Sequence, residues 1–404
     1  MRRVVITGLG IFSVLGDSEE SVAKALYEGK SGIVLEPQRK KHGLHSALTG
    51  KLIGKIPDDL FSKKERQCMT PFAQQACMAA ITAVGSADIR PRDIATDRAG
   101  IIFGNDSSIL AAQEQAKALS KAGTTAGMGS GHVFRGMNST ISMHLNVILG
   151  NLGPSLTVSS ACASGAFAIA MAFDQIRLGR MDMAVVGGAQ ELNWQSVAAL
   201  EALNACSSNP DPEQASRPFD KDRDGLVPSG GAAALFLEDY ESAKKRNVPI
   251  LAEILGYGAS SDGNTLFKPK SEGLARSMRM AIKEADFCGS LDLVSAHGTS
   301  TILGDAAEAE SLREVFGTCT PPVTAFKSYT GHELWMSGAS QLVYTICMAR
   351  AGFTAPCKNF VEPDKNTAGI PILTKRLDVP PKLVLHNAAG FGGTSISMVV
   401  RYYP

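Results

Sequence analysis

The residue best placed to do chemistry is Cys162, inside the stretch TVSSACASGAFAIAMAFDQI at residues 157–176. The β-branched pair Thr157-Val158 leads through small residues to the cysteine, and an apolar segment without proline or charge follows as far as Asp174. This pattern predicts a strand, a tight turn and a buried helix. At such a junction the helix dipole and the first free N–H groups stabilise a thiolate, so we expect a thiol pKa below the usual value of about 8.5. By itself the pattern fits a nucleophile and an inert core cysteine equally well.

Two histidines and a lysine supply the missing partners. His297 lies in VSAHGTSTILGD, at the end of an expected strand and before a run of hydroxyls, and FKSYTGHE places Lys327 five residues before His332. Active sites of α/β proteins collect at strand ends of this kind. Without its motif, Lys327 would be interpreted as a solvated surface charge. The other histidines lack this context and are interpreted as structural or surface residues: His42, His45, His132, His144 and His386.

The elements that must position these residues follow an alternating pattern. Short apolar runs predict buried strands at 3–10, 98–105, 155–160, 181–189, 233–240, 251–263 and 291–298, and a strand pair around a glycine turn at 382–402. Helical patterns separate them at 19–29, 70–87, 108–121, 163–178, 194–204, 271–286, 304–316 and 337–351. Alternating strands and helices predict a layered α/β fold.

The chain contains a faint internal repeat. VVITGLGIFS, which starts at Val4, and AEILGYGASS, which starts at Ala252, are each a strand that ends in Gly-x-Gly and small residues. We expect two similar halves, 1–250 and 251–404, in one compact unit with a seam near residue 250. The first half carries the cysteine, and the second carries the histidine and lysine motifs and the last glycine-rich loop.

Composition excludes several classes of protein. The 404 residues are 44% hydrophobic and 20% charged with a net charge of +1, which fits a globular chain and gives no global sign of a nucleic acid or membrane partner. None of the eight cysteines forms a Cys-x-x-Cys pair, which argues against a zinc ribbon or a thioredoxin-type site. No run of 18 apolar residues predicts a transmembrane helix. Three glycines and an acidic cluster argue against a signal peptide at the start of the chain, so we expect a cytoplasmic protein.

Five motifs together identify a family resemblance. In order along the chain they are SSACASGAFA, RPFDKDRDG (217–225), AHGTST, KSYTGH and GFGGTS. The whole chain resembles an elongating β-ketoacyl-acyl-carrier-protein synthase of the thiolase superfamily, most of all the bacterial fatty-acid type. The resemblance implies an α/β thiolase fold, with five layers α-β-α-β-α built from two similar halves, and a homodimer.

The resemblance also implies an acyltransferase reaction and its residues. An acyl group would pass from a carrier protein to Cys162, and decarboxylative condensation with malonyl-carrier protein would follow. The oxyanion would be held by the backbone N–H groups of Cys162 and Phe391, and the enolate by His297 and His332. Lys327 would organise the site by pairing with the carboxylate of Glu308. Further expected residues are Asp305 in support, Thr299 and Thr301 on the pantetheine arm, and Phe391 and Gly392 at the acyl pocket. Neither a metal nor an organic cofactor is expected.

Carrier proteins of this family are acidic, so a basic docking patch is expected. SKKER at 62–66 offers Lys63, Lys64 and Arg66, although a solvated helix end explains these residues as well. The competing patch is KKR at 244–246.

Several positions depart from the family pattern and leave the substrate open. Glu333, Trp335 and Met336 stand where small residues are usual after the second histidine, Ala388 and Ala389 where Ser-Phe is common, and Ile302 where proline is common. A specialised polyene, pigment or polyketide pathway, with a non-identical partner subunit, is therefore the alternative to fatty-acid synthesis. A thiolase is less favoured because the last glycine loop lacks a cysteine. A non-catalytic partner subunit would lack the nucleophile, and an unrelated cysteine hydrolase would need neither Lys327 nor a second histidine.

Overall fold

The computed structural model describes residues 1–404, except for the side chain of Pro91. The strands are β1 (Val4–Phe12), β2 (Ile33–Leu35), β3 (Leu48–Gly50), β4 (Ala99–Gly104), β5 (Ser155–Val158), β6 (Met183–Gln190), β7 (Gly231–Asp239), β8 (Ala252–Ser261), β9 (Leu293–Ser295), β10 (Val323–Thr324), β11 (Leu383–Gly390) and β12 (Thr394–Tyr402). The longer helices are α1 (Glu19–Glu28), α4 (Pro71–Ser86), α6 (Ile109–Ala122), α8 (Thr140–Leu149), α9 (Ser164–Arg177), α10 (Trp194–Ala202), α12 (Ser271–Ala285), α13 (Ile302–Phe316) and α15 (Ser337–Arg350). Short helices are α2 (Gln38–Lys41), α3 (Lys63–Cys68), α5 (Pro91–Ile94), α7 (His132–Gly136), α11 (Tyr240–Arg246) and α14 (Lys327–Thr330), with 3₁₀ turns η1 (Thr125–Gly127), η2 (Gly317–Cys319), η3 (Leu334–Met336) and η4 (Phe391–Gly393).

The large sheet repeats one arrangement twice. Its ten strands run in the order β10-β9-β11-β12-β8-β1-β7-β6-β4-β5. The half β1-β7-β6-β4-β5 has the same sequence of antiparallel and parallel pairings as the half β8-β12-β11-β9-β10. The two halves meet where residues 4–6 of β1 pair antiparallel with residues 252–254 of β8. The strands β2 and β3 form a separate pair.

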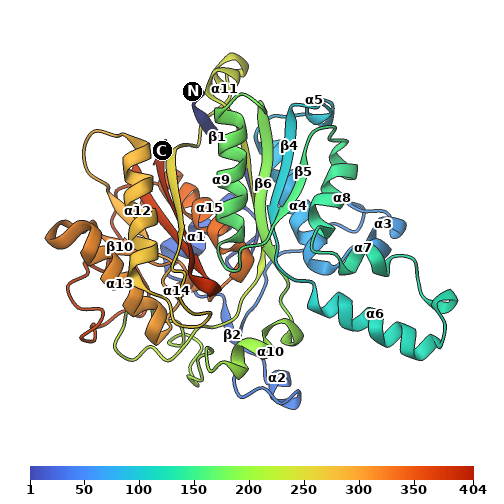
Figure 1. Ribbon diagram of the computed structural model, residues 1–404, viewed down its shortest axis with the longest axis horizontal. Helices are drawn as coiled ribbons and strands as arrows, with labels where there is room; N and C mark the ends of the chain where they lie inside the picture. Colours follow the sequence, from blue (N-terminus) through green and yellow to red (C-terminus); the bar gives the residue numbers. More distant parts are fainter.

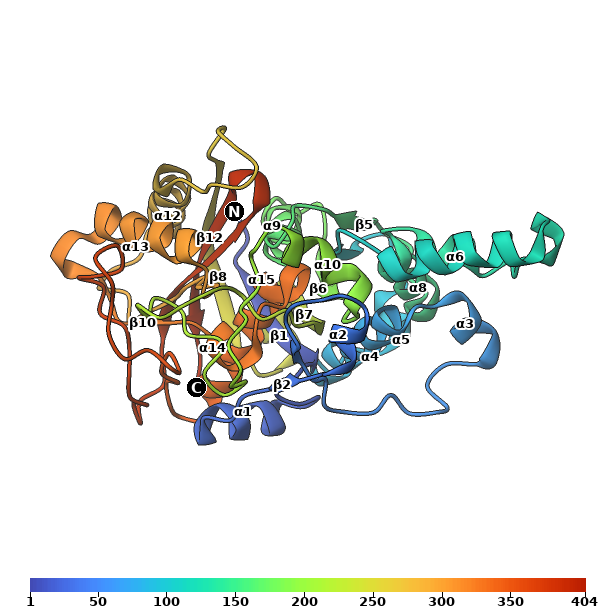
Figure 2. The same ribbon diagram turned by 90° about the horizontal axis from the view of Figure 1, so that it is seen from below.

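Three hydrophobic cores hold the five layers together, and the central core covers both faces of the middle helical layer. The central core contains α9 and α15, which pack on each other between the two halves of the sheet (Figure 1). A second core lies between α4, α8 and the first half, and a third between α12, α13 and the second half. The predicted thiolase-type layering is therefore confirmed. Turned by 90°, the molecule is elongated, and α6 projects from one end (Figure 2).

Glycines in the two repeated strands have equivalent neighbours, which explains the faint sequence repeat. A Cβ atom on Gly10 of β1 would lie 1.9 Å from the carbonyl oxygen of Ala79 in α4. On Gly258 of β8 it would lie 2.2 Å from the carbonyl oxygen of Ser277 in α12. Glycine is needed in both strands because the outer helix packs directly on the strand backbone.

Most predicted elements match the structure within a few residues. The sequence pattern missed several short segments, among them β2, β3, β10, α7 and α8, because two to ten residues give little periodicity. None of the helices in the described part of the chain is both long and apolar enough to cross a membrane.

Candidate active site

Cys162 lies where predicted, in a tight turn between β5 and α9. The preceding residue, Ala161, has a φ of +47°, and α9 begins at Ser164 with Ala163 as its N-cap. The turn is held by the Asp106 carboxylate, which accepts the N–H of Ala161 at 3.0 Å, and by Ser164 Oγ, which donates to the Ala161 carbonyl at 2.6 Å. A positive φ at a residue other than glycine is uncommon, so the turn persists because these hydrogen bonds hold it.

The expected thiolate at rest needs a correction. Cys162 is only 4% exposed, and this burial raises the pKa of its thiol to about 12. The nearby Lys327 ammonium opposes that rise, whereas the Asp106 carboxylate adds to it. The resting sulfur is therefore a thiol, because desolvation outweighs the favourable helix start.

His297 follows β9 directly and is held by its backbone. Glu308 on α13 accepts the N–H groups of His297 and Gly298 at 2.9 and 2.8 Å, and it also accepts the side-chain amide of Asn387 at 3.1 Å. Burial raises the pKa of Glu308. Glu308 therefore supports the site by fixing the loop of His297.

Lys327 is buried, but its partner is not the one expected. Its Nζ donates to the carbonyl oxygen of His297 at 2.6 Å and lies 3.4 Å from both His297 Nδ1 and Gln341 Oε1. Glu308 is occupied by backbone N–H groups, and none of the ion pairs among the described side chains joins it to Lys327. The expected Lys327–Glu308 contact is therefore wrong, although Glu308 still acts on Lys327 through space. Burial lowers the pKa of Lys327 to about 8.

The two histidine rings lie edge to face with their centroids 5.3 Å apart and an interplanar angle of 83°. His332 Nδ1 accepts the N–H of Leu334 at 3.2 Å, which assigns the ring proton to Nε2. Burial, together with the Lys327 charge, lowers the pKa of both imidazoles well below 6.5. Both rings are therefore neutral, as expected for groups that donate a hydrogen bond to a developing anion.

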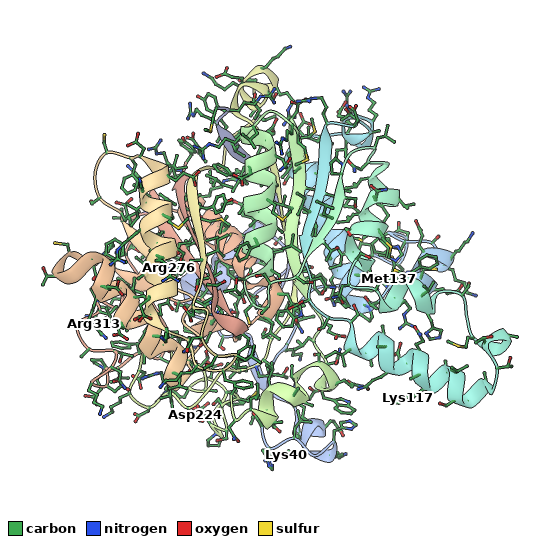
Figure 3. All side chains as sticks on the ribbon, in the orientation of Figure 1. Lys40, Lys117, Met137, Asp224, Arg276 and Arg313 are labelled. Carbon is green, nitrogen blue, oxygen red and sulfur yellow. The ribbon has the colours of Figure 1, made fainter. Side chains whose placement is uncertain are left out.

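One cavity of about 590 Å³ joins most of the expected residues. Its wall includes Cys162, His297, His332, Thr299, Thr301, Asp305, Glu308 and Phe391. Neither Lys327 nor Gly392 is part of that wall: the lysine lies behind His297, and Gly392 occupies a turn with a φ of +78°. The cavity wall also includes Asp224, an exposed residue labelled at the lower edge of the molecule in Figure 3.

The loop of three hydroxyl residues before α13, residues 299–301, is held by the carboxylate of Asp305. Thr299 and Thr301 lie with their Oγ1 atoms 2.8 Å apart, and the carboxylate of Asp305 accepts the N–H groups of Thr299 and Ser300 at 2.8 and 3.1 Å. Ser300 has a φ of +65°. Burial raises the pKa of Asp305 to about 7. Asp305 therefore fixes the backbone of Thr299 and Ser300.

Phe391 also lines the cavity; it is 42% exposed and lies in the turn after β11. A Cβ atom on the preceding residue, Gly390, would lie 3.1 Å from the backbone nitrogen of Cys162. The glycine thus brings the Phe391 backbone beside the nucleophile turn, where a second oxyanion donor would have to be.

The three large residues after His332 do not line the cavity. Glu333 and Met336 are buried in the protein core, and the Trp335 side chain packs in a cluster with Cys162, Leu200 and Leu334 and donates to Ser107 Oγ at 3.3 Å. The Trp335 backbone lies across Gly188, where a Cβ atom would be 2.6 Å from its carbonyl oxygen. Of residues 333–336, only Leu334 lines the cavity, so the three large residues are not part of its wall.

Sequence reasoning missed the supporting residues Asp106, Gln341 and Asn387. Gln341 Nε2 donates to the Ser295, Ala296 and Asn387 carbonyls, which ties α15 to β9 and β11. An amide inside the apolar helix at 337–351 was the available signal, because a buried polar side chain needs partners.

The two basic patches differ in their surroundings. Lys63 and Lys64 are exposed on α3, which Ser62 and Glu65 cap at its start. In the competing patch, Arg246 is bound to Glu238 at 2.7 Å and to the Ala87 carbonyl. That patch belongs to α11, at the end of the molecule opposite Asp224 (Figures 1 and 3).

Among the described side chains, no group of three or more His, Cys, Asp or Glu residues is arranged to hold a metal ion. All eight cysteines are free.

Comparison with known proteins gives a consistent assignment. Residues 1–243 match the family model of the β-ketoacyl synthase N-terminal domain, and residues 251–361 match that of the C-terminal domain. The 3-oxoacyl-[acyl-carrier-protein] synthase 1 of Escherichia coli (strain K12) is 36% identical over 405 residues, which cover 99% of each chain.

Two solved structures have the same fold over their whole length. A β-ketoacyl synthase from Burkholderia phymatum STM815 is 32% identical with a TM-score of 0.94, and each chain is covered completely. A type II polyketide-synthase ketosynthase, in complex with its acyl-carrier protein and bound to the hexaketide, is 29% identical with a TM-score of 0.89, again with complete coverage of both chains.

Proposed function

The chain belongs to the β-ketoacyl synthase family of acyltransferases, and we propose that it condenses an acyl thioester with malonyl-acyl-carrier protein to give β-ketoacyl-acyl-carrier protein and CO₂. The observation that carries this proposal is the meeting of Cys162, His297 and His332 in one cavity. A buried thiol facing two neutral imidazoles suits acyl transfer followed by stabilisation of an enolate.

Acyl transfer comes first. The Cys162 sulfur attacks the acyl thioester carbonyl, the carrier thiolate leaves, and the thiol proton passes to it, so that the products are acyl-Cys162 and carrier thiol. Because the resting thiol has a pKa of about 12, proton loss accompanies the attack. The backbone N–H groups of Cys162 and Phe391 are proposed to hold the tetrahedral oxyanion. Loss of one such donor typically costs about 2.7–4 kcal/mol.

Condensation follows in the same cavity. Malonyl thioester loses CO₂, and the electron pair of the broken bond forms an enolate whose oxygen accepts hydrogen bonds from Nε2–H of His297 and His332. The enolate carbon then attacks acyl-Cys162, and the sulfur leaves and regains a proton. The β-ketoacyl product is two carbons longer than the acyl group. Neutral imidazoles favour this step because they stabilise charge as it develops. Thr299 and Thr301 are proposed to bind the pantetheine arm, and Phe391 with Gly392 to gate the acyl pocket.

The acyl substrate class has two candidates. Fatty-acid elongation is supported by the similarity to the Escherichia coli synthase. A specialised polyketide or polyene pathway is supported by the similarity to the type II ketosynthase and by the unusual residues Trp335 and Ile302. Incubation with malonyl-carrier protein and a panel of saturated and polyenoic acyl-carrier thioesters, with products identified by mass, decides between them. No condensation with any member would overturn the proposal.

The edge of the sheet at β5 bears on how the protein assembles. The outer edge of β5 is unpaired within the described chain, and exposed apolar side chains lie nearby at Val147, Leu152 and Leu156. Such an edge and patch favour association, and a homodimer in the cytoplasm is proposed. Light-scattering mass of the purified chain tests the homodimer against a chain that needs a non-identical subunit.

A further inference from the structure

Glu333 is a buried carboxylate directly behind the active-site histidine. It follows His332 in the chain, is 2% exposed and does not line the cavity. Its Oε1 accepts the hydroxyl of Tyr344 at 2.5 Å, and its Oε2 accepts the hydroxyl of Ser340 at 2.6 Å. A carboxyl group in the protein core is costly unless it is paired, and the reaction described above does not use this one.

The helix that binds Glu333 also binds Lys327. On α15, Ser340 donates to Glu333, and the next residue, Gln341, accepts Lys327 Nζ at 3.4 Å. Consecutive residues of one rigid helix thus hold a buried anion and a buried cation. Glu308 and Glu333 are the two strongest influences that raise the pKa of Lys327, against the burial that lowers it. Burial raises the pKa of Glu333 to about 7, and Lys327 in turn acts to lower it.

Other titratable groups lie around this pair. Tyr344 faces Glu333 from α15, and its own pKa is raised by burial and by the carboxylate. Lys327 is also influenced by Cys162 and Asp305 and is in contact with His297. Because Glu308 holds the backbone N–H groups of residues 297 and 298, Glu333 is the nearby carboxylate whose bonds go only to hydroxyls.

Glu333 also lies within the strained turn that fixes His332. Leu334 has a φ of +43°, and in this conformation its N–H donates to His332 Nδ1. Such a backbone conformation persists only where the surroundings hold it. The two hydroxyl bonds of Glu333 fasten the residue between the histidine and the strained leucine to α15.

From this arrangement we propose that Glu333 is a positioning residue, which fastens the His332 turn to α15 and supplies negative charge that keeps Lys327 protonated. The inference rests on the proposed function, because it assigns a role within the same site. It also gives a reason for a large acidic residue where the family usually has a small one.

The test measures malonyl-carrier decarboxylation against pH from 6 to 10. Glu333→Gln keeps the shape and can keep both hydroxyl contacts, but it removes the charge. We expect the alkaline limb of kcat to move about 1 pH unit lower, with KM unchanged. Glu333→Asp retains the charge and should return the limb to within about 0.3 pH unit of the wild-type position.

Further variants separate charge from folding. Glu333→Ser, which also removes the charge, should show the same shift as Glu333→Gln and keeps the test available if the amide variant fails to fold. Glu238→Gln removes a buried carboxylate that is paired with Arg246 and Thr7, and it should lower the melting temperature without moving the limb. An unmoved limb in both charge-removing variants overturns the inference. Absence of decarboxylation in the wild-type protein would instead reject the proposed function.

Discussion

Lys327 Nζ donates a 2.6 Å hydrogen bond to the carbonyl oxygen of His297, the residue whose ring it also approaches. The lysine therefore fixes the backbone and the ring orientation of His297 together. A protonated Nζ beside Nδ1 requires that nitrogen to accept, which leaves the ring proton on Nε2. His332 reaches the same tautomer through the N–H of Leu334. A lysine ammonium at His297 and a backbone N–H at His332 thus have the same effect: each ring keeps its proton on Nε2 and can donate it in a hydrogen bond.

The first prediction concerns the nucleophile. Cys162→Ala should lower condensation by at least about 10³-fold, because no acyl-enzyme can form. Incubation with acyl-carrier protein followed by intact-mass measurement should show one acyl adduct on the wild type and none on the variant. Cys206→Ala is the matched control, since Cys206 packs against the same cluster and should leave the adduct unchanged. An adduct mapped to a different cysteine would reject the assignment.

The second prediction separates the two half-reactions. His297→Ala and His332→Ala should each lower malonyl decarboxylation by about 10²–10³-fold, the usual effect of losing one donor to a developing oxyanion. Acyl transfer to Cys162 should fall less. His386→Gln serves as the control because His386 is buried against Tyr402, with Nε2 2.6 Å from the hydroxyl, and does not line the cavity. Normal condensation by either alanine variant would refute the histidine roles.

The third prediction is a pH dependence. Lys327 has a pKa of about 8 in the folded protein, so its ammonium is charged below that pH and neutral above it. Loss of the charge removes support for the enolate, and decarboxylation should fall about tenfold per pH unit well above pH 8. Lys327→Ala should be slow at every pH and should lack this limb. A wild-type rate that stays flat up to pH 10 would contradict the assignment.

The fourth prediction tests Trp335. Replacing the indole by hydrogen in Trp335→Gly empties space in the cluster beside Cys162, at a cost of about 3–5 kcal/mol in the free energy of unfolding. We expect the range of accepted acyl lengths to change towards longer chains, measured as product masses from a mixed acyl-carrier panel. Trp194→Leu is the matched control, because this indole packs against the same cluster but stacks on His42, with ring centroids 4.3 Å apart. An unaltered length profile counts against the role.

The fifth prediction concerns carrier docking. The double variant Lys63→Glu, Lys64→Glu should raise the KM for malonyl-carrier protein about tenfold or more with little change in kcat, because charge mainly steers association. Added salt should likewise raise the KM of the wild-type protein for malonyl-carrier protein. Lys244→Glu with Lys245→Glu is the matched control on α11. Equal effects of both pairs would indicate a general charge effect and not a docking patch.

The motifs were enough to predict that Cys162, His297 and His332 meet in one cavity, but not how the residues around them are bonded. Cys162, His297 and His332 could be assigned because each stands beside glycine and small residues at the end of an element. The Lys327–Glu308 contact could not be judged in this way, because a buried carboxylate accepts whichever donors the fold brings closest, and here these are backbone N–H groups. The thiol pKa was misjudged for a related reason: the helix start was visible in the sequence, whereas the degree of burial was not.

The fold was predictable for the long elements and for the repeat. Helices such as 337–351 are strongly apolar, and Gly10 and Gly258 carry the mark of close helix packing. The strand β10, with two residues, has no pattern of its own and exists only because β9 lies beside it.

The repeated strand order places Cys162, shortly after β5, and Lys327, shortly after β10, at equivalent points of the two halves. This correspondence follows from the matching strand order and pairing of the two halves. The first half contributes the cysteine to the cavity, and the second contributes both histidines. The cavity is therefore built by both halves of the chain, and a mutation in either half acts on the same site.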